Sequence, residues 1–265
     1  MKIAVWQTSP VSGAAEALTR LKGALAAAAE AGAALLVTPE MYLSGYAIGP
    51  ERVAAAAADP SAWAKAQALA AEHGITLCLG GPAPAAEVGG RPLNVARLLG
   101  GEGAEGLTYA KTHLFGDLDR AQFSAGDGPI PPVPLAGHRI GLAICYDIEF
   151  PETARLLATA GATLLAVPTA NMVPFDSVCT RLVPARAEEN GIAIAYANYV
   201  GREGGLTYCG RSCIVGPDGE DLARADGVEE TLLIAEVDPA MIEAARARTP
   251  YLADRRPALY GALAQ

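Results

Sequence analysis

Short apolar runs alternate along this chain with longer segments in which small and apolar residues recur at helical spacing. Apolar runs of about four to eight residues between turn residues predict buried strands, and longer amphipathic segments predict helices. Strands mixed with helices along the whole chain indicate a layered α/β architecture with a buried sheet face. The predicted strands span 2–8, 33–38, 75–80, 92–99, 139–146, 162–168, 192–198, 211–215 and 231–237, and the predicted helices span 14–31, 60–73, 151–160, 178–190 and 239–247.

The helix predicted at 60–73 carries its own boundary signals. Asp59 is a favoured capping residue, and Pro60 is favoured in the first turn of a helix. Gly74 closes the segment, since glycine readily adopts the left-handed conformation that ends many helices.

Neither an internal repeat nor a linker divides the 265 residues, so we predict a single domain over 1–265. With 51% hydrophobic and 18% charged residues, the chain can bury a substantial core. Its net charge of −9 argues against nucleic acid or an anionic membrane surface as a partner. A small neutral or cationic substrate fits this charge better.

Two apolar segments raise the question of a membrane. Residues 156–175 carry no charge, but Gly161, Pro168, Asn171 and Pro174 interrupt them, which predicts a helix end, a buried strand and a loop. The apolar run at the N-terminus stops at Gln7 and is too short for a secretory signal. We therefore expect a cytoplasmic protein.

Five cysteines are present: Cys78, Cys145, Cys179, Cys209 and Cys213. They contain no CxxC pair, and the three histidines, His73, His113 and His138, are scattered, so the sequence predicts neither a zinc site nor another metal. The odd number of cysteines in a long chain favours reduced thiols. Any one of them is ordinarily a small buried hydrophobe.

Cys145 differs because it ends an apolar run, in GLAICYDIEFPE. A reactive cysteine needs a neighbour that makes or stabilises its thiolate, and no histidine is placed as an obvious partner. Glu40 in LLVTPEMYLSGY and Lys111 in YAKTHLF also follow strand-like runs. Each alone is ordinarily a solvated charge. Together the three predict a Cys-Lys-Glu nucleophilic site at one edge of a sheet.

The segments PEMYLSGY, YAKTHLF and CYDIEFPE, in this order and spacing, resemble the three signatures of the nitrilase superfamily of carbon-nitrogen hydrolases. The resemblance runs from Met1 to about residue 250. It implies a four-layer αββα sandwich, and commonly a homodimer or a higher homo-oligomer. It assigns Glu40 as general base and acid, Lys111 as the cation that stabilises the oxyanion, and Cys145 as nucleophile, with no cofactor.

Longer segments, among them CYDIEFPETAR, VPTANMVPFD and YCGRSCIVGPDG, resemble a bacterial amidase branch that includes 5-aminopentanamidase and (R)-stereoselective amidases. This resemblance implies hydrolysis of a short linear primary amide, such as an ω-amino or ω-guanidino amide, to the acid and ammonia. Two other reactions stay open on the same scaffold, hydrolysis of an N-carbamoyl amine and of a nitrile. A catalytically silent binding protein is a third reading, which the intact Glu40, Lys111 and Cys145 disfavour.

One departure from the family pattern concerns a second glutamate in the loop after the lysine. Here the acids in that loop are Asp117 and Asp119. Asp119 lies eight residues after Lys111 and seven before Gly126, which fits the place of the second glutamate better than Asp117 does. We predict Asp119 for this role and keep Asp117 as the alternative.

The remaining candidates concern the substrate. The resemblance places Asn171, Phe175 and Tyr46 around the substrate cleft and the backbone N–H of Tyr146 in the oxyanion site. Glu149 stands where relatives that hydrolyse ω-amides of dicarboxylic acids often have arginine, so it favours a cationic substrate over an anionic one. The alternative is an internal ion pair of Glu149, for example with Arg155. Arg181 and Arg186 are candidate helix partners for Glu188 or Glu189.

Overall fold

Two six-stranded sheets form the centre of the protein in a computed structural model that describes residues 1–87, 89–100 and 107–261. The first sheet has the strand order β14-β1-β2-β3-β4-β5, and the second has the order β13-β12-β9-β8-β7-β6. At the centre of each sheet three strands run parallel, β1-β2-β3 and β7-β8-β9, and the flanking strands are antiparallel. The two halves of the molecule therefore have the same layout.

The first sheet contains β1 (Lys2–Gln7), β2 (Leu35–Val37), β3 (Thr76–Ala83), β4 (Leu93–Leu99), β5 (Thr108–Ala110) and β14 (Thr231–Glu236). The second contains β6 (Val133–Leu135), β7 (His138–Leu142), β8 (Leu164–Pro168), β9 (Ala193–Ala197), β12 (Cys213–Val215) and β13 (Asp221–Arg224). A small ribbon pairs β10 (Arg202–Glu203) with β11 (Leu206–Thr207). The α-helices are α1 (Ala14–Glu30), α2 (Pro50–Ala58), α3 (Ser61–His73), α4 (Gly116–Gln122), α5 (Pro151–Thr159), α6 (Val183–Asn190), α7 (Pro239–Arg248) and α8 (Tyr251–Asp254).

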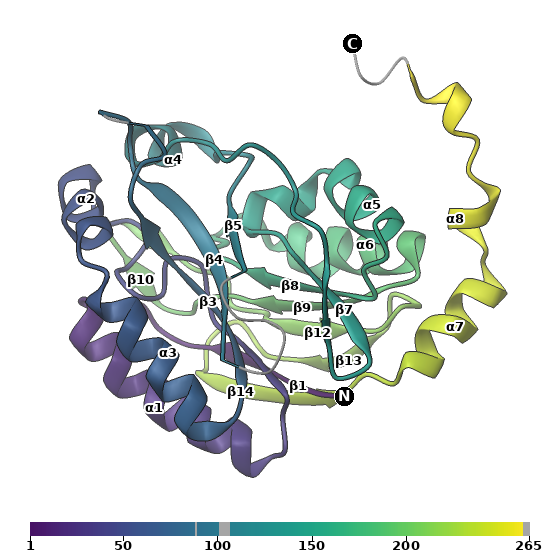
Figure 1. Ribbon diagram of the computed structural model, residues 1–265, viewed down its shortest axis with the longest axis horizontal. Coiled ribbons are helices and arrows are strands. Elements are labelled where there is room, and N and C mark those ends of the chain that lie inside the picture. Colours follow the sequence, from purple (N-terminus) through teal and green to yellow (C-terminus); the bar gives the residue numbers. More distant parts are fainter. Residues whose placement is uncertain (88, 101–106, 262–265) are drawn as a thin grey trace.

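Alternation along the strands sends neighbouring side chains into different layers. On β1, Ala4 packs toward α1 and α3, whereas Ile3 and Val5 pack between the two sheets. On β8, Leu164 faces the first sheet while Leu165 packs with α5 and α6. Figure 1 shows α1 and α3 on one side of the strands and α5 and α6 on the other. This is the predicted four-layer αββα sandwich, and the prediction is confirmed.

Local signals behave as predicted at the uncharged segment 156–175 and in part at α3. Gly74 adopts φ 65° at the end of α3, and Asp59 Oδ1 accepts a hydrogen bond of 2.9 Å from the Ser61 N–H. The helix begins at Ser61 with Pro60 as its N-cap, so Pro60 is not in the first turn. The uncharged segment contains the end of α5, all of β8 and a loop. Among the described residues, no helix combines the length and the hydropathy needed to cross a bilayer.

The predicted elements were wrong or incomplete at several places. The strand predicted over 139–146 ends at Leu142, and a 3-10 turn (Cys145–Glu149) replaces its end. The helix predicted over 178–190 begins as a π-turn (Val178–Leu182) before α6, next to Pro184, which lacks an N–H for the helical ladder. β5, β6 and β13 have only three or four residues, too few for a readable alternation, and the short helices α2 and α4 were also missed.

Candidate active site

Glu40 lies in the turn that follows β2, and the backbone fixes this turn closely. Its N–H donates to the Thr169 carbonyl at 3.2 Å, and its own carbonyl accepts the Tyr199 hydroxyl at 2.9 Å. Gly80 on β3 lies directly against the turn, because a Cβ there would come within 2.5 Å of the Pro39 carbonyl oxygen and 2.9 Å of the Glu40 Cα. A glycine at position 80 is therefore what lets the Glu40 turn lie against β3.

Lys111 follows β5, and its backbone is held on both sides. Its N–H donates to the Asn94 carbonyl at 2.9 Å, and its carbonyl accepts the Gly126 N–H at 2.8 Å. Gly126 has no room for a side chain, since a Cβ would collide with the Ala110 carbonyl. The end of β5 is thus fixed before its side chain makes any contact.

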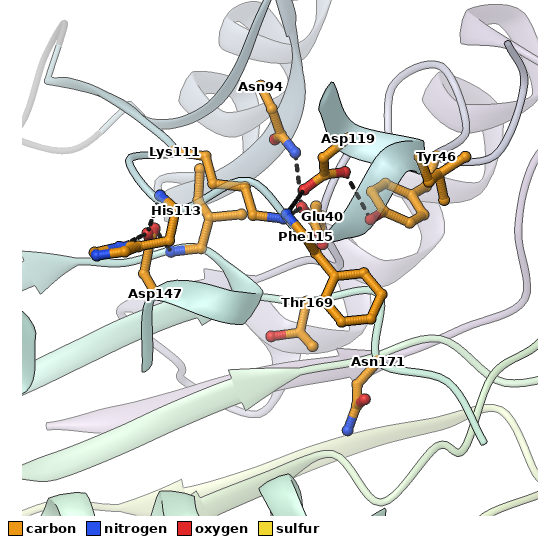
Figure 2. A network of polar contacts seen from close by, with 12 residues as sticks. Glu40, Tyr46, Asn94, Lys111, His113, Phe115, Asp119, Asp147, Thr169 and Asn171 are labelled. Atoms are coloured by element: carbon orange, nitrogen blue, oxygen red, sulfur yellow. Dashed lines mark hydrogen bonds and ion pairs between the residues drawn. The ribbon is translucent and has the colours of Figure 1, made fainter. Parts of the chain in front are cut away.

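The Lys111 ammonium lies between two carboxylates, as Figure 2 shows. Nζ is 2.7 Å from Glu40 Oε1 and 2.6 Å from Asp119 Oδ2, and all three side chains are fully buried. Asn94 Nδ2 also donates to Glu40 Oε1 at 2.7 Å, whereas Glu40 Oε2 is buried without a hydrogen-bond partner in the described chain. One oxygen of Glu40 is therefore hydrogen-bonded to its neighbours, and the other accepts no hydrogen bond from the described residues.

Asp119 and Asp117 occupy opposite environments on the short helix α4. Besides Lys111, Asp119 accepts the Tyr46 hydroxyl at 2.7 Å and the Phe115 N–H at 2.8 Å. Asp117 is fully exposed and lies 4.0 Å from Arg120. The geometry places Asp119, and not Asp117, beside Lys111, at the position predicted from the spacing.

Cys145 comes from the other sheet. It follows β7, is 9% exposed, and adopts φ 47°, a left-handed conformation that is uncommon for a residue with a side chain. Glu40 and Lys111 follow strands of the first sheet, so the prediction that all three meet at one edge of a sheet was wrong. Cys145 lies in the core between the two sheets and feels the charges of Glu40 and Lys111, so the three side chains gather between sheets that pack face to face.

Burial and the neighbouring charges shift the pKa values of Cys145, Glu40 and Lys111. Burial and the Glu40 carboxylate raise the pKa of the Cys145 thiol well above its usual range, against the opposing effect of Lys111. Burial also raises the pKa of Glu40, with Lys111 opposing it. The two carboxylates overcome the burial of Lys111 and raise its pKa well above the ordinary value. The thiol therefore rests protonated next to a permanent ammonium and a carboxyl group that titrates above the usual glutamate range.

The residues predicted to line the cleft differ in exposure. Tyr46 is 1% exposed and its hydroxyl supports Asp119, so its predicted substrate contact stays a prediction. Asn171 is buried and its Nδ2 donates to the Phe175 carbonyl at 3.0 Å. Phe175 is 42% exposed and packs edge-on against Phe115, with the ring centroids 5.6 Å apart.

Glu149 is partly buried, and the alternative of an ion pair with Arg155 was wrong: within the described ranges Glu149 forms no ion pair. Burial raises the pKa of Glu149, and the positive charges of Lys111 and Arg186 oppose this shift. Arg186 pairs instead with Glu189 at 3.3 Å, one of its two predicted partners, and donates to the Glu149 carbonyl at 2.8 Å. Among the residues that the structure describes, the Glu149 carboxylate thus has no ion-pair partner, and it lies near the Lys111 charge.

Three residues of the site were missed from the sequence. Asn94 bonds Glu40, the Ala170 backbone lowers the pKa of the Cys145 thiol, and Asp147, within the turn that carries Cys145, accepts several hydrogen bonds. Asn94 carried a signal, because it is a polar residue in the apolar run PLNVARLL. Asp147 lies in the segment CYDIEFPE, whereas nothing distinguishes Ala170.

A buried thiol next to a carboxylate and an ammonium, between the two sheets of an αββα sandwich, defines a class of enzyme that uses a cysteine nucleophile. In the part of the chain that the structure describes, no group of three or more His, Cys, Asp or Glu side chains is placed to hold a metal ion. The family model for carbon-nitrogen hydrolases matches residues 2–247, so the chain belongs to this family.

Known relatives agree with this assignment. The chain is 48% identical over 234 residues to "Hydrolase in pqqF 5'region" of Pseudomonas protegens, covering 87% of this chain and 81% of that protein. It is 40% identical over 232 residues to an (R)-stereoselective amidase of Pseudomonas sp, covering 86% of this chain and 81% of that protein.

A solved structure agrees as well. The fold matches a mutant of the amidase from Nesterenkonia sp. AN1 that shows the result of Michael addition of acrylamide at the active site cysteine. The TM-score is 0.84 at 36% identity, over 98% of both chains. Together with the family match, these likenesses make the chain an amidase of the nitrilase superfamily.

Proposed function

We propose that this amidase hydrolyses a short linear primary amide to the carboxylic acid and ammonia through a thioester on Cys145. The observation that carries the proposal is the asymmetry of Glu40. Oε1 is occupied by Lys111 and Asn94, while Oε2 is buried without a partner among the described residues. A buried carboxylate oxygen without a hydrogen-bond partner destabilises the fold, so its presence suggests a function. The function proposed here is to accept a proton.

The first step removes the thiol proton. Because the pKa of Cys145 is raised, the thiol does not ionise by itself at neutral pH, so Glu40 takes the proton as the sulfur attacks the amide carbon. The negative charge that develops on the carbonyl oxygen faces the Lys111 ammonium. The Tyr146 N–H is a second donor, since the first N–H groups of a helical turn lack partners within the turn.

The second step expels the amine. Glu40 returns its proton to the departing nitrogen, so ammonia leaves and the acyl group stays on sulfur as a thioester. Glu40 then draws a proton from a water molecule, which attacks the thioester and releases the acid and the thiol. Asp119 keeps Lys111 pointing at the oxyanion and compensates its charge while Glu40 changes protonation.

Substrate selection is proposed to involve Glu149 and a group of aromatic rings beside the nucleophile. The Tyr146 ring packs against Phe115 at 5.4 Å and against Phe150 at 4.9 Å. A carboxylate next to aromatic faces suits an ammonium or guanidinium group. An amide with a cationic group at its far end, such as 5-aminopentanamide or its guanidino analogue, therefore fits better than one with a carboxylate.

The same geometry is compatible with hydrolysis of an N-carbamoyl amine or of a nitrile, because both begin with attack of sulfur on an electrophilic carbon. The products separate the carbamoyl reaction, because an N-carbamoyl amine releases carbon dioxide together with ammonia, whereas a primary amide releases the carboxylic acid and ammonia. A nitrile also yields the acid and ammonia, so the choice of substrate, a primary amide or a nitrile, separates the other two. A silent binding protein would release none of these products.

The experiment is a panel of primary amides that differ only in the distal group, which is an amine, a guanidinium, a carboxylate or a methyl group. Ammonia release should be fastest for the cationic members and slowest for the carboxylate. Glu149→Gln should lower kcat/KM for the amine about tenfold and leave the methyl member nearly unchanged. Glu152→Gln, on the exposed start of α5, is the matched control and should change neither.

Equal losses on the amine and methyl members would overturn the role of Glu149 while leaving the amidase reaction intact. Absence of ammonia from every amide, with release from a nitrile or a carbamoyl amine, would overturn the proposed substrate class.

A further inference from the structure

Asp147 is a buried charge that the proposed reaction does not use. It lies two residues after Cys145 in the 3-10 turn and is 0% exposed. Burying a carboxylate is expensive unless hydrogen bonds compensate its charge, so a full set of partners is expected around it.

Both oxygens of Asp147 are heavily occupied. Oδ2 accepts the Ile144 N–H at 3.0 Å and the Tyr109 hydroxyl at 2.8 Å. Oδ1 accepts the Thr112 hydroxyl at 2.9 Å, the His113 N–H at 2.9 Å and His113 Nδ1 at 2.8 Å. The last of these contacts appears beside the Lys111 cluster in Figure 2.

These partners come from two different sheets. The Ile144 bond closes the turn that carries Cys145 after β7, while Tyr109, Thr112 and His113 flank Lys111 at the end of β5. In the described chain, every hydrogen bond between residues 107–126 and residues 138–150 ends on the Asp147 carboxylate. One side chain therefore makes the direct polar link between the two segments.

The link is ionic at neutral pH. Burial alone would raise the pKa of Asp147, but the hydrogen bonds from His113, the Ile144 N–H and Tyr109 outweigh burial and hold that pKa below the ordinary value. Hydrogen bonds to a charged acceptor are about twice as strong as neutral ones. They therefore hold the Cys145 turn firmly against the segment around Lys111.

We propose that Asp147 is a positioning residue that holds the Cys145 turn against the Lys111 segment and so keeps sulfur and ammonium in register across the two sheets. The inference rests on the proposed amidase reaction of Cys145. Cys145 adopts a left-handed backbone conformation, and such a conformation persists only where its surroundings enforce it. The Ile144 bond fixes the turn, and the bonds to Tyr109, Thr112 and His113 fix where the turn lies.

The proposal predicts which kinetic constant changes. Without the hydrogen bonds of Asp147, the Cys145 turn would shift relative to the Lys111 segment. The nucleophile would then be misplaced relative to the oxyanion donors, which lowers kcat because the geometry that the transition state requires is lost. Asp147 is enclosed by its own partners, so substrate binding and KM should change little.

The test compares Asp147→Asn with the double variant Tyr109→Phe/Thr112→Val, which keeps the carboxylate and its bond to the turn but removes two bridging hydroxyls. The matched control is Tyr251→Phe/Thr159→Val. Tyr251 is exposed, and the Thr159 hydroxyl donates to carbonyls of its own helix. Each protein is assayed for kcat and KM with a primary amide, for the rate at which iodoacetamide labels Cys145, and for thermal unfolding. Label at Cys145 is counted by peptide mass spectrometry.

Asp147→Asn should lower kcat per folded molecule about ten- to a hundredfold and the double variant about tenfold, with KM within about twofold, because bonds to a charged acceptor are lost. The labelling rate of Cys145 should change in both variants and stay constant in the control. If Asp147→Asn fails to fold, the double variant decides the question.

A merely structural Asp147 would lower the unfolding temperature while kcat per folded molecule and the labelling rate stay at the wild-type values, and that result would overturn the proposal. Failure of the wild-type protein to release ammonia would instead overturn the amidase reaction. In that case the labelling rates of Cys145 in the variants still report whether Asp147 positions the thiol. Failure of the Asp147 proposal can therefore be distinguished from failure of the amidase reaction.

Discussion

The two sheets contribute unlike halves to the site. The first sheet supplies Glu40 and Lys111, and the helix α4 that follows β5 adds Asp119. These three buried charges are compensated by ion pairs of 2.6–2.7 Å and by hydrogen bonds from side chains. The second sheet supplies Cys145, an uncharged thiol on a turn whose conformation the backbone and Asp147 enforce. Ion pairs hold the first half, whereas a left-handed backbone and the hydrogen bonds of Asp147 hold the second.

The difference follows from what each group costs to bury. A charge in the interior destabilises the fold unless partners compensate it, so each charged residue here brings a network with it. A thiol behaves as a small apolar group and needs no partner, so only its position must be fixed. Substitutions on the charged half should therefore affect stability and activity together, whereas substitution of Cys145, the proposed nucleophile, should affect activity alone.

The largest effect is expected for Cys145→Ala. Turnover of a primary amide should fall more than about 10⁴-fold, since loss of a nucleophile removes the covalent route. The free energy of unfolding should change by less than about 1 kcal/mol, because only one small apolar atom is lost. Enzyme kinetics and urea denaturation measure the two quantities.

Cys213→Ala is the matched control for that variant, since Cys213 is a buried cysteine on β12. It should keep its activity. Residual turnover of Cys145→Ala above about one per cent of the wild type would contradict the thioester route.

The next largest effect separates stability from catalysis on the charged half. Lys111→Met leaves two buried carboxylates facing each other without their cation, so unfolding free energy should drop by about 3–5 kcal/mol. Loss of Lys111 as the proposed oxyanion donor should also lower kcat about 10²–10³-fold. In the double variant Lys111→Met/Asp119→Asn, one of the two charges is gone, so stability should partly return while activity does not.

Asp117→Asn is the control for the added substitution, because Asp117 is fully exposed. If the double variant were as unstable as Lys111→Met alone, the repulsion between buried carboxylates would not be what destabilises the single variant.

Much of this arrangement was readable from the sequence. Motif order identified the αββα sandwich, and the spacing from Lys111 to Asp119 picked the buried acid over Asp117, because α4 turns that position inward. Short apolar runs located the central strands, since buried parallel strands are apolar on both faces.

Other features depend on contacts between distant segments, which no local pattern encodes. The meeting of Cys145 with Lys111 between two sheets, and not at one edge, follows from how the halves pack face to face. The hydrogen bond from Asn94 to Glu40 joins residues 54 positions apart. Asp147 similarly gathers partners 34 to 38 positions away, so its role emerged only with the fold.

The smallest expected effect concerns the pH dependence of the charged half. Burial raises the pKa of Glu40, and Glu40 can act as the proposed acceptor of the thiol proton only as a carboxylate. Therefore kcat/KM should fall as pH decreases through a midpoint above that of an ordinary glutamate. The hydrogen bond from Asn94 opposes this shift, and Asn94→Leu removes it. The acidic midpoint of the variant should therefore move to higher pH, with the activity on the plateau less affected.

Profiles of kcat/KM against pH for the wild type and Asn94→Leu measure this displacement. Asn190→Leu serves as the matched control, because Asn190 is a buried asparagine on α6 that bonds only the Arg186 carbonyl among the described residues. Its profile should coincide with the wild type. A midpoint for Asn94→Leu that stays fixed or moves to lower pH would show that the proton acceptor is not the carboxylate that Asn94 contacts. The charged half would then need a different base, while the nucleophile turn would be unaffected.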